Sequence, residues 1–495
     1  MVDLKNISRI YFIGIGGIGM SALARYFSSK GVTVSGYDKT ESNLSKQLQN
    51  EGINIHYSDD INLLDKDAQL IVYTPAVPKE HKEFIYYQQN NYTLLKRSDV
   101  LGKITDDCYN ICVAGTHGKT TISAMIAHIL RDSGYGCNAF LGGVSTNYNT
   151  NFWASEKNVC VIEADEFDRS FLKLKPDIAI ISAMDADHLD IYGTEEVMQN
   201  AFVEFAGKIK PNGLLLSKHG LKKDKELKAP VHFRYSLQND AADIYASNIT
   251  MSNGSYTFDV MTADWTLDNV ILNMGGMHNV ENVVVAISVA HHLKIEPGKI
   301  KKAVENFKGV KRRFEYIIAP SQHSKQSDSS FSSPLAKKGR DEVIFIDDYA
   351  HHPEELKALI TGAKTLFSGM RCTVVFQPHL FTRTRDLAKE FANILDMADE
   401  VILLPIYPAR ELPIEGVTSE LILKEMKMAK ASIKTKEELL NYLRISKGSL
   451  STDSYRDGER WGEGGALFIT AGAGDIDKLV EPIKEIILNN KNILL

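Results

Sequence analysis

The feature that most constrains the fold is a glycine-rich turn between a short apolar run and an amphipathic segment. It reads Gly115-Thr116-His117-Gly118-Lys119-Thr120-Thr121 and follows the apolar residues 111–114. Apolar residues then recur at helical spacing as far as Gly134, where we expect the helix to end. A strand, a glycine turn and a helix in this order aim free N–H groups and the positive end of the helix dipole at an anion. The stretch therefore predicts a phosphate-binding cradle.

Two side chains of the cradle carry chemistry of their own. Lys119 adds a full positive charge for a triphosphate, and Thr120 offers a hydroxyl suited to Mg²⁺. The spacing departs from that of the usual P-loop, because Val113 stands where a first glycine is expected. An ordinary strand-to-helix turn is the competing interpretation, and the motif alone specifies only a triphosphate.

The bulk properties narrow the class of protein. A chain of 495 residues is too long for one hydrophobic core and predicts about three domains. Its net charge of −6 gives no indication of a nucleic-acid surface. The five cysteines are odd in number and scattered, which indicates reduced thiols and a cytoplasmic protein. No apolar run approaches the roughly 20 residues that span a bilayer, so we expect no membrane insertion; a monomer and a homodimer both remain open.

A second glycine turn lies near the N-terminus. Residues 9–13 form an expected strand that leads into a Gly-x-Gly-x-x-Gly motif, and a helix should follow as far as Gly31. A second strand, 33–37, ends at Asp38, where a dinucleotide-binding fold holds a ribose hydroxyl. The segment alone indicates NAD or FAD, although other diphosphate ligands satisfy the same physics. The candidate binding residues are Gly14, Gly16, Gly17, Ile18, Gly19 and Asp38.

Side chains with metal-binding chemistry follow two later strands. Glu163 comes directly after residues 159–162, and Asp185, Asp187 and His188 follow residues 178–181. Because ligands lie at the carboxyl ends of parallel strands, these side chains should converge on the cradle. Glu163 can ligate Mg²⁺, and His188 can ligate a second ion. For either residue alone, a hydrogen-bonded loop position is an equally good explanation.

The segment between these strands and the C-terminal part is more ambiguous. Alternating polarity from 231 to 275 predicts an antiparallel flap with a turn at Asn253-Gly254. Asparagines at 279 and 282 can read an adenine edge, but they can equally cap a turn. Three cations at 311–313 form either a solvated charge run or a phosphate clamp. Residues 319–341 and 446–465 predict flexible surface loops.

Four apolar strands in the C-terminal part each lead into polar or glycine-rich residues. The expected strands are 343–346, 373–376, 401–404 and 467–470, and Pro353 is well placed to begin a helix after the first. Four such ends in succession predict a ligand site along one rim of a sheet.

Taken together, the motifs resemble those of the Mur ligases of peptidoglycan synthesis, over essentially the whole chain, and within them the branch that joins L-alanine to UDP-N-acetylmuramate. The resemblance implies an α/β protein of three domains. A Rossmann-like domain (1–103) would bind the UDP-sugar, a central P-loop-type ATPase domain (104–316) would have a mostly parallel sheet with a small antiparallel flap, and a Rossmann-like C-terminal domain (317–495) would bind the amino acid. The matching stretches are 14–20, 115–121, 163–172, 185–190, 278–282, 312–315, 347–353 and 472–476.

The resemblance also implies an activity and roles for individual residues. ATP would phosphorylate the lactyl carboxylate of UDP-N-acetylmuramate, and the amine of L-alanine would attack the acyl phosphate. The implied catalytic residues are Lys119, Glu163, His188 and Arg313, and the implied Mg²⁺ ligands are Thr120, Glu163 and His188. ATP would contact Gly115, Thr116, His117, Gly118, Lys119, Thr120, Thr121, His278, Asn279 and Asn282, and the amino acid would contact Tyr349, His351, His379 and Arg383.

One departure from the family pattern concerns Leu380, which stands where the family often has an arginine. It leaves the expected carboxylate clamp one cation short unless Arg385 or another group substitutes. Three other functions were weighed: a recycling ligase that adds a tripeptide to the same UDP-sugar, an NAD-dependent oxidoreductase, and a nucleotide-gated binding protein without turnover. The compact motifs at 349–352 and 377–379 favour a small amino acid, and an oxidoreductase would leave Lys119 and Glu163 without a role.

Overall fold

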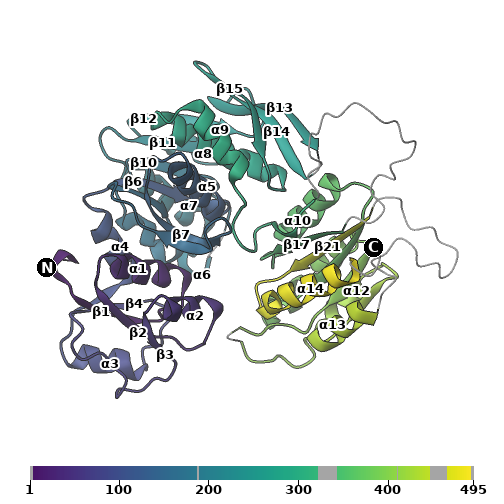
Figure 1. Ribbon diagram of the computed structural model, residues 1–495, viewed down its shortest axis with the longest axis horizontal. Helices are drawn as coiled ribbons and strands as arrows, with labels where there is room; N and C mark the ends of the chain where they lie inside the picture. Colours follow the sequence, from purple (N-terminus) through teal and green to yellow (C-terminus); the bar gives the residue numbers. More distant parts are fainter. Residues whose placement is uncertain are drawn as a thin grey trace. The chain divides into compact units, whose positions relative to one another are not determined.

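The computed structural model describes residues 4–186, 189–252, 254–320, 343–409, 411–445 and 465–491. Contacts within the chain divide it into two compact units. The first unit comprises Met1–Asn248, Phe258–Ile271 and Val280–Phe307, and the second comprises Ile249–Thr257, Leu272–Asn279 and Lys308–Leu495. The described strands form three sheets, each with helices packed on it, as an α/β fold of three domains requires (Figure 1).

The N-terminal sheet is parallel, with the strand order β3-β2-β1-β4-β5. Successive side chains of β1 point to opposite faces, so Ile10 and Phe12 pack with helix α1, whereas Tyr11 and Ile13 pack with Tyr87 of helix α3. Burial on both faces explains why the strand predicted at 9–13 is apolar from Ile10 to Ile13. The elements are β1 (Arg9–Ile13), α1 (Ile18–Ser29), β2 (Thr33–Tyr37), α2 (Asn43–Asn50), β3 (Asn54–His56), β4 (Leu70–Tyr73), α3 (Lys82–Gln89), β5 (Leu94–Lys96) and α4 (Arg97–Thr105).

The cradle belongs to the ten-stranded central sheet, whose order is β15-β14-β13-β12-β11-β10-β6-β9-β7-β8. Strand β6 leads into the cradle and pairs in parallel with β9 on one side and β10 on the other. The carboxyl ends of these three strands therefore meet at one edge. The elements up to β11 are β6 (Tyr109–Ala114), α5 (Lys119–Asp132), β7 (Asn138–Ser145), β8 (Thr150–Trp153), β9 (Val159–Glu163), η2 (Phe167–Lys173), β10 (Ile178–Ile181), α6 (Leu189–Tyr192), α7 (Glu195–Ala206) and β11 (Leu214–Lys218).

The strands expected as a small antiparallel flap are continuous with this sheet. Strand β12 pairs in parallel with β11 and β13, and β14 and β15 extend the same edge. Sequence alternation identified these strands but could not show that their edge is joined to the buried sheet. The remaining elements are β12 (Val231–Ser236), β13 (Ile244–Ser252), β14 (Ser255–Thr262), β15 (Thr266–Leu272), α8 (Met277–His292) and α9 (Pro297–Asn306).

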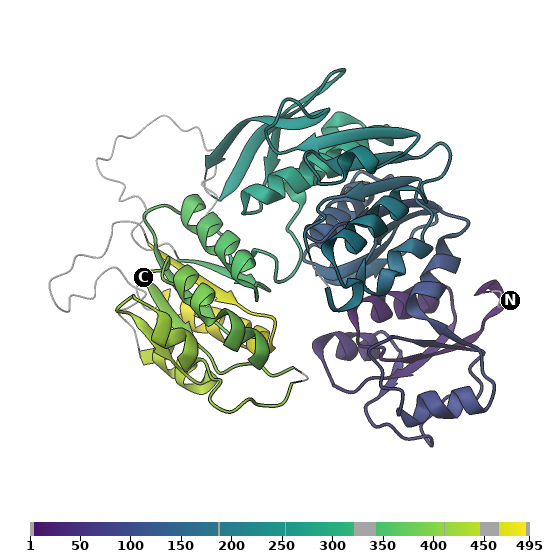
Figure 2. The same ribbon diagram turned by 180° about the vertical axis from the view of Figure 1, so that it is seen from behind.

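The C-terminal sheet has the order β16-β17-β21-β18-β19-β20, in which all strands except β16 are parallel. The four expected strands therefore do end along one rim, and α10 begins at Pro353 as predicted. Each face of the sheet has its own apolar cluster, and helices cover both faces (Figure 2). The elements are β16 (Glu315–Ile318), β17 (Val343–Asp348), α10 (Pro353–Leu366), β18 (Arg371–Phe376), α11 (Phe381–Leu395), β19 (Glu400–Leu403), α12 (Glu420–Glu425), β20 (Ala431–Ile433), α13 (Lys436–Ile445), β21 (Ala466–Ala471) and α14 (Val480–Lys491).

Other expectations fall partly outside the described residues. The loops predicted at 319–341 and 446–465 lie outside them except for residues 319, 320 and 465, and so does Asn253 of the predicted turn. All five cysteines are free, as predicted. Within the described ranges, no helix has both the length and the apolar character needed to cross a membrane.

Candidate active site

The cradle is a left-handed turn at the N-terminus of α5. Gly115 and Gly118 have φ angles of +131° and +82°, which side chains with a Cβ rarely adopt. A Cβ on Gly115 would also lie 2.3 Å from Oγ of Ser182, so the backbone approaches the segment after β10 closely. Helix α5 begins at Lys119 immediately after Gly118, and the N–H groups of its first turn are available to an anion in the loop.

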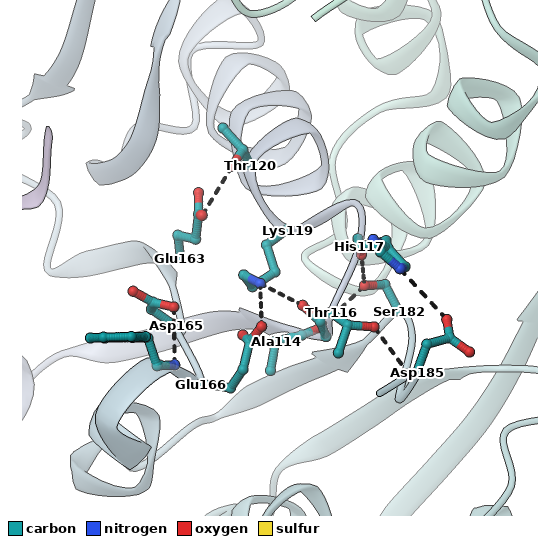
Figure 3. Close-up of polar contacts among 12 residues, drawn as sticks. Ala114, Thr116, His117, Lys119, Thr120, Glu163, Asp165, Glu166, Ser182 and Asp185 are labelled. Carbon is teal, nitrogen blue, oxygen red and sulfur yellow. Dashed lines mark hydrogen bonds and ion pairs between the residues drawn. The ribbon is translucent and has the colours of Figure 1, made fainter. Parts of the chain in front are cut away.

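The segment after β10 holds the loop in shape (Figure 3). The hydroxyl of Ser182 donates to the carbonyl of His117. The N–H of Thr116 donates to the carbonyl of Ala183 at 3.2 Å, and the N–H of Asp185 donates to the hydroxyl of Thr116 at 3.2 Å. The imidazole of His117 is itself exposed, 3.8 Å from a carboxylate oxygen of Asp185. Thr116 therefore serves to fix the loop, whose backbone N–H groups suit an anion.

Thr120 and Glu163, predicted as metal ligands, lie side by side. The hydroxyl of Thr120 donates to Oε1 of Glu163 at 2.9 Å, and the N–H of Gly142 on β7 donates to Oε2 at 2.9 Å. Burial raises the pKa of Glu163, and the nearby charge of Lys119 and the bond from Thr120 oppose that rise. A buried carboxylate next to a hydroxyl is a donor set that suits a hard cation such as Mg²⁺.

That donor set is small, because the described residues contain no group of three or more His, Cys, Asp or Glu side chains arranged to hold a metal. Mg²⁺ commonly uses one or two protein carboxylates and completes its shell with water and phosphate oxygens, so the arrangement fits a cation that binds together with a nucleotide. His188, the third predicted ligand, lies outside the described residues.

Lys119 and Asn282 are two more of the residues predicted to contact the nucleotide. Lys119 donates from Nζ to the carbonyl of Gly115 at 2.7 Å and to Oε1 of Glu166 at 2.8 Å (Figure 3). The amide oxygen of Asn282, at the start of α8, lies 3.1 Å from where a Cβ on Gly118 would be. Thr121 is buried in the first turn of α5.

His278 and Asn279 belong to the second unit. Asn279 is 1% exposed; its side chain donates to the carbonyl of Gly275 at 2.6 Å, and its N–H donates to the carbonyl of Gly276 at 2.8 Å. This amide therefore stabilises the turn that begins α8, which is the capping role that sequence reasoning had left open.

The N-terminal glycine loop is built around Asp38. The N–H of Gly16 donates to Oδ2 of Asp38 at 2.7 Å, and the N–H of Thr40 donates to Oδ1 at 3.1 Å. The carboxylate thus stabilises the loop itself, whereas a dinucleotide-binding fold would use it for a ribose hydroxyl. Gly14, with φ of +86°, donates to the carbonyl of Tyr37 at 2.8 Å.

The end of this loop leaves helix α1 open to an anion. Gly17 caps α1 without a side-chain hydrogen bond, and Ile18 begins the helix with its side chain exposed. The guanidinium of Arg97 crosses Gly19, with Nη1 3.0 Å from where a Cβ would lie. A side chain at position 19 would crowd this cation, and the loop suits a diphosphate.

The four residues predicted for the amino acid form one cluster at the rim of the C-terminal sheet. The ring centroids of Tyr349 and His351 are 5.2 Å apart, and those of His351 and His379 are 5.7 Å apart. Nη1 of Arg383 lies 3.5 Å from the carbonyl oxygen of His351. His379 also stacks on Tyr407 after β19, with centroids 5.9 Å apart. Residues that follow β17, β18 and β19 thus form a cluster that combines aromatic rings with a guanidinium.

Two charged residues, Asp348 and Arg313, adjoin this cluster. Asp348 accepts the N–H of Phe314 at 2.6 Å and the N–H of Ala350 at 2.7 Å, and burial raises its pKa against the opposing charge of Arg313. Arg313 lies over the ring of Tyr349, 5.6 Å from its centroid. Burial lowers the pKa of the His351 imidazole, so the ring is neutral near pH 7.

Leu380, where the chain departs from the family pattern, has an unusual backbone conformation. Leu380 has a φ of +72° at the N-terminal end of α11, an uncommon conformation for a branched side chain. Arg385, considered as a substitute cation, pairs instead with the adjacent Asp386, with Nε and Oδ1 2.7 Å apart and both side chains exposed. Of these two arginines, the structure therefore places Arg383 next to His351.

Sequence reasoning missed the partners of the predicted residues. Glu166 pairs with Lys119, and the backbone N–H of Gly142 holds Glu163. Glu166 lies within the matched stretch 163–172, so its position was visible, but only the three-dimensional structure reveals what it contacts. The Gly142 contact is made by the backbone and leaves no side-chain signal in the sequence.

Comparisons with known proteins show which family the chain resembles. Three family models match consecutive parts of the chain: the Mur ligase family, catalytic domain, at residues 9–109, the Mur ligase middle domain at 113–290, and the Mur ligase, glutamate ligase domain, at 335–449. A UDP-N-acetylmuramate–L-alanine ligase from Parabacteroides distasonis is 43% identical over 98% of both chains. The enzyme of the same name from Flavobacterium johnsoniae is also 43% identical, over 99% of this chain and 100% of its own.

Solved structures show the same likeness. The UDP-N-acetylmuramate-alanine ligase from Thermotoga maritima superposes with a TM-score of 0.75, at 26% identity over 98% of this chain and 99% of its own. A murein peptide ligase from Psychrobacter arcticus shares the fold, with a TM-score of 0.61 at 21% identity over 98% of both chains. With the cradle, the paired Thr120 and Glu163 and relatives this similar over nearly the full length, the chain belongs to the Mur ligase family.

Proposed function

We propose that this protein is an ATP-dependent ligase that joins L-alanine to the lactyl carboxylate of UDP-N-acetylmuramate. The observation that carries the proposal is the 43% identity, over nearly the full length, to enzymes named for this reaction. Three parts of the structure support the proposal: the cradle suits a triphosphate, the N-terminal glycine loop suits the diphosphate of a UDP-sugar, and the aromatic cluster with Arg383 suits an amino acid.

The first chemical step is transfer of the γ-phosphoryl group of ATP to a carboxylate oxygen. Both reactants are anions, so the protein must offset negative charge more than it must supply covalent help. The N–H groups at the start of α5 and the ammonium of Lys119 supply this compensation. The bond that breaks joins the γ-phosphorus to the bridging oxygen, which leaves with ADP, and the bond that forms joins phosphorus to the lactyl carboxylate.

Thr120, Glu163 and His188 would hold Mg²⁺ in this site. The ion supplies charge neutralisation on the phosphate oxygens when bound. The fit rests on the Glu163 carboxylate, to which the Thr120 hydroxyl and the Gly142 N–H both donate.

The second step is attack of the alanine amine on the acyl phosphate. The carboxylate of alanine suits the guanidinium of Arg383. The amine must be neutral to attack. Nδ1 of His351 lies 2.9 Å from the carbonyl oxygen of Tyr349, and a proton on Nδ1 would leave Nε2 free to accept one from the amine. Phosphate is the leaving group, and an amide is the product.

The test is phosphate release from the purified protein. We expect turnover only when ATP, Mg²⁺, UDP-N-acetylmuramate and L-alanine are all present, and little when any one is omitted. A peptide substrate in place of alanine separates this function from that of a recycling ligase: faster turnover with an L-alanine-containing tripeptide would refute the proposal. Lys119→Met should abolish turnover, and a variant that keeps its activity would remove the cradle from the mechanism.

A further inference from the structure

The ammonium of Lys119 is held by a second buried acid that the reaction does not account for. Nζ of Lys119 lies 2.8 Å from Oε1 of Glu166, and the side chains of the two residues are 14% and 0% exposed. This is a buried ion pair, so screening by solvent does not reduce it as it would a surface pair. Figure 3 shows the carboxylate of Glu166 on the side of Lys119 away from Thr120.

Glu166 is itself fixed by its main chain. Its carbonyl accepts the hydroxyl of Tyr192 at 2.6 Å and the N–H of Arg169 at 2.9 Å. The turn that follows holds Asp168 and Arg169 at φ of +55° and +54°, an uncommon conformation for residues other than glycine. Such a turn persists where surrounding contacts hold it in place, and here it places the Glu166 carboxylate next to the Lys119 ammonium.

The carboxylate has little other hydrogen bonding. Oε2 of Glu166 has no hydrogen-bond partner among the described residues and is buried. A buried charge with one oxygen unbonded is costly, so this acid depends on Lys119 for its stabilisation. A nucleotide that binds through Lys119 therefore competes with Glu166 for the same ammonium.

We propose that Glu166 is a positioning residue that holds Lys119 at the cradle and weakens the hold of the site on nucleotide, so that ADP is released after turnover. The release of ADP after turnover rests on the proposed function, whereas the competition for Lys119 concerns nucleotide binding alone. The charge of Glu166 opposes a second anion at Lys119, and its fixed position sets the direction in which the ammonium points.

Glu166→Gln tests the charge, because it keeps the shape of the side chain. We expect ADP, titrated without other substrates, to bind about tenfold more tightly than to the wild-type protein, and kcat to fall at least tenfold while KM for ATP falls. Asp168→Asn is the matched control: it removes an exposed carboxylate from the same turn, and asparagine tolerates the positive φ. Its ADP affinity and kcat should stay within twofold of wild type.

Unchanged or weaker ADP binding by Glu166→Gln would overturn the proposal. Glu166→Asp keeps the charge but shortens the side chain, so ADP affinity should stay within threefold while kcat falls about tenfold; wild-type kcat in this variant would also overturn it. If alanine does not support phosphate release, the proposed function fails, but the ADP titrations still decide the role of Glu166.

A double-mutant cycle adds a readout that does not depend on activity. Lys119→Met leaves Glu166 buried without a counter-charge, so its thermal unfolding midpoint should drop. Adding Glu166→Gln should then raise the midpoint of the Lys119→Met protein, although the same substitution lowers that of the wild type. Equal effects of Glu166→Gln in both backgrounds would show that the two side chains are not coupled and would refute the inference.

Discussion

Arg25 of α1 and Asn151 of β8 form a buried polar joint between the N-terminal and central sheets of the first unit. The guanidinium donates through Nη1 to the amide oxygen of Asn151, while Nε and Nη2 donate to Glu51 at 2.8 and 2.7 Å. The amide of Asn151 in turn donates to the carbonyl of Ile18 at 2.6 Å and to the hydroxyl of Ser21 at 3.0 Å. Because α1 starts at the glycine loop, this joint fixes the loop to the sheet that carries the cradle.

Asn151→Ala should therefore impair both stability and turnover. It leaves the buried guanidinium and the carbonyl of Ile18 each short of a partner, at a cost of roughly 1–3 kcal/mol. We expect kcat to fall about tenfold, because a small displacement of one reactant misaligns the other. Asn90→Ala removes an exposed side-chain bond to the carbonyl of Tyr86 and serves as the control. Thermal unfolding and steady-state kinetics of both variants measure the difference; equal kcat values would separate the joint from catalysis.

Gly142→Ala should abolish activity by displacing Glu163. A Cβ at this position would lie 2.3 Å from the carboxylate oxygen that Gly142 now holds through its N–H. The control is Gly102→Ala in α4, where the nearest atom to a new Cβ is at 3.5 Å, an ordinary contact. We expect the control to retain wild-type turnover, and Gly142→Ala to lose at least 100-fold in kcat at saturating ATP. A Gly142→Ala protein with wild-type kcat would show that Glu163 need not stay where it is.

The strands and the cradle were predictable because their signals are local. The run 111–114, the glycines of the loop and the spacing of apolar residues to Gly134 correspond to β6, the left-handed turn and α5. The rim of the C-terminal sheet was predictable for the same reason, since β17, β18 and β19 lead directly into the residues of the aromatic cluster.

The contacts between segments were not predictable from one sequence. Glu166 and Lys119 are separated by 47 residues, and Arg25 and Asn151 by 126 residues, so no periodicity connects them. The spacing of Asp38 from the glycines predicts a ribose contact, but it does not reveal that this carboxylate accepts the backbone N–H groups of Gly16 and Thr40. The sequence pattern predicts where a residue lies along a helix or strand, whereas the packing of distant segments determines which residue it contacts.

Arg383→Met should weaken the binding of alanine selectively. Loss of a charge-assisted bond to a carboxylate costs roughly 1.5–3 kcal/mol, so KM for L-alanine should rise at least tenfold while KM for ATP changes less than twofold. Arg385→Met removes an arginine two residues away that is exposed and paired with Asp386, and it should leave both KM values unchanged. If KM for alanine rises with Arg385→Met but not with Arg383→Met, then Arg385 binds the alanine carboxylate and Arg383 does not.

A buried acid in the N-terminal domain should make its stability depend on pH. The side chain of Glu83 is 0% exposed and accepts the hydroxyl of Tyr11 at 2.7 Å, and Tyr11 also contacts Nε2 of His56 at 2.7 Å. Burial raises the pKa of Glu83 from 4.5 to about 7, with Asp59 and Asp60 raising it further and the Tyr11 bond opposing the rise. The folded domain therefore holds a proton on Glu83 that the unfolded chain releases at lower pH.

The sign follows from the number of protons bound. Between pH 4.5 and 7 the folded state binds more protons at Glu83 than the unfolded state, so the free energy of unfolding falls as pH rises and levels off above pH 7. The loss is at most roughly 3 kcal/mol. Burial lowers the pKa of His56, which works in the opposite direction on the acid side of its usual value, so only a comparison of variants isolates Glu83.

Glu83→Gln should remove the Glu83 part of this dependence. Hydrogen exchange of the β1 amides, corrected for intrinsic rates, gives the local free energy of unfolding from pH 5 to 8. We expect the wild-type value to fall relative to that of Glu83→Gln as pH rises, with the two diverging most above pH 7. Glu80→Gln changes an exposed carboxylate three residues earlier and should keep the wild-type profile. Parallel profiles for Glu83→Gln and the wild type would mean that Glu83 is ionised in the folded domain throughout this range.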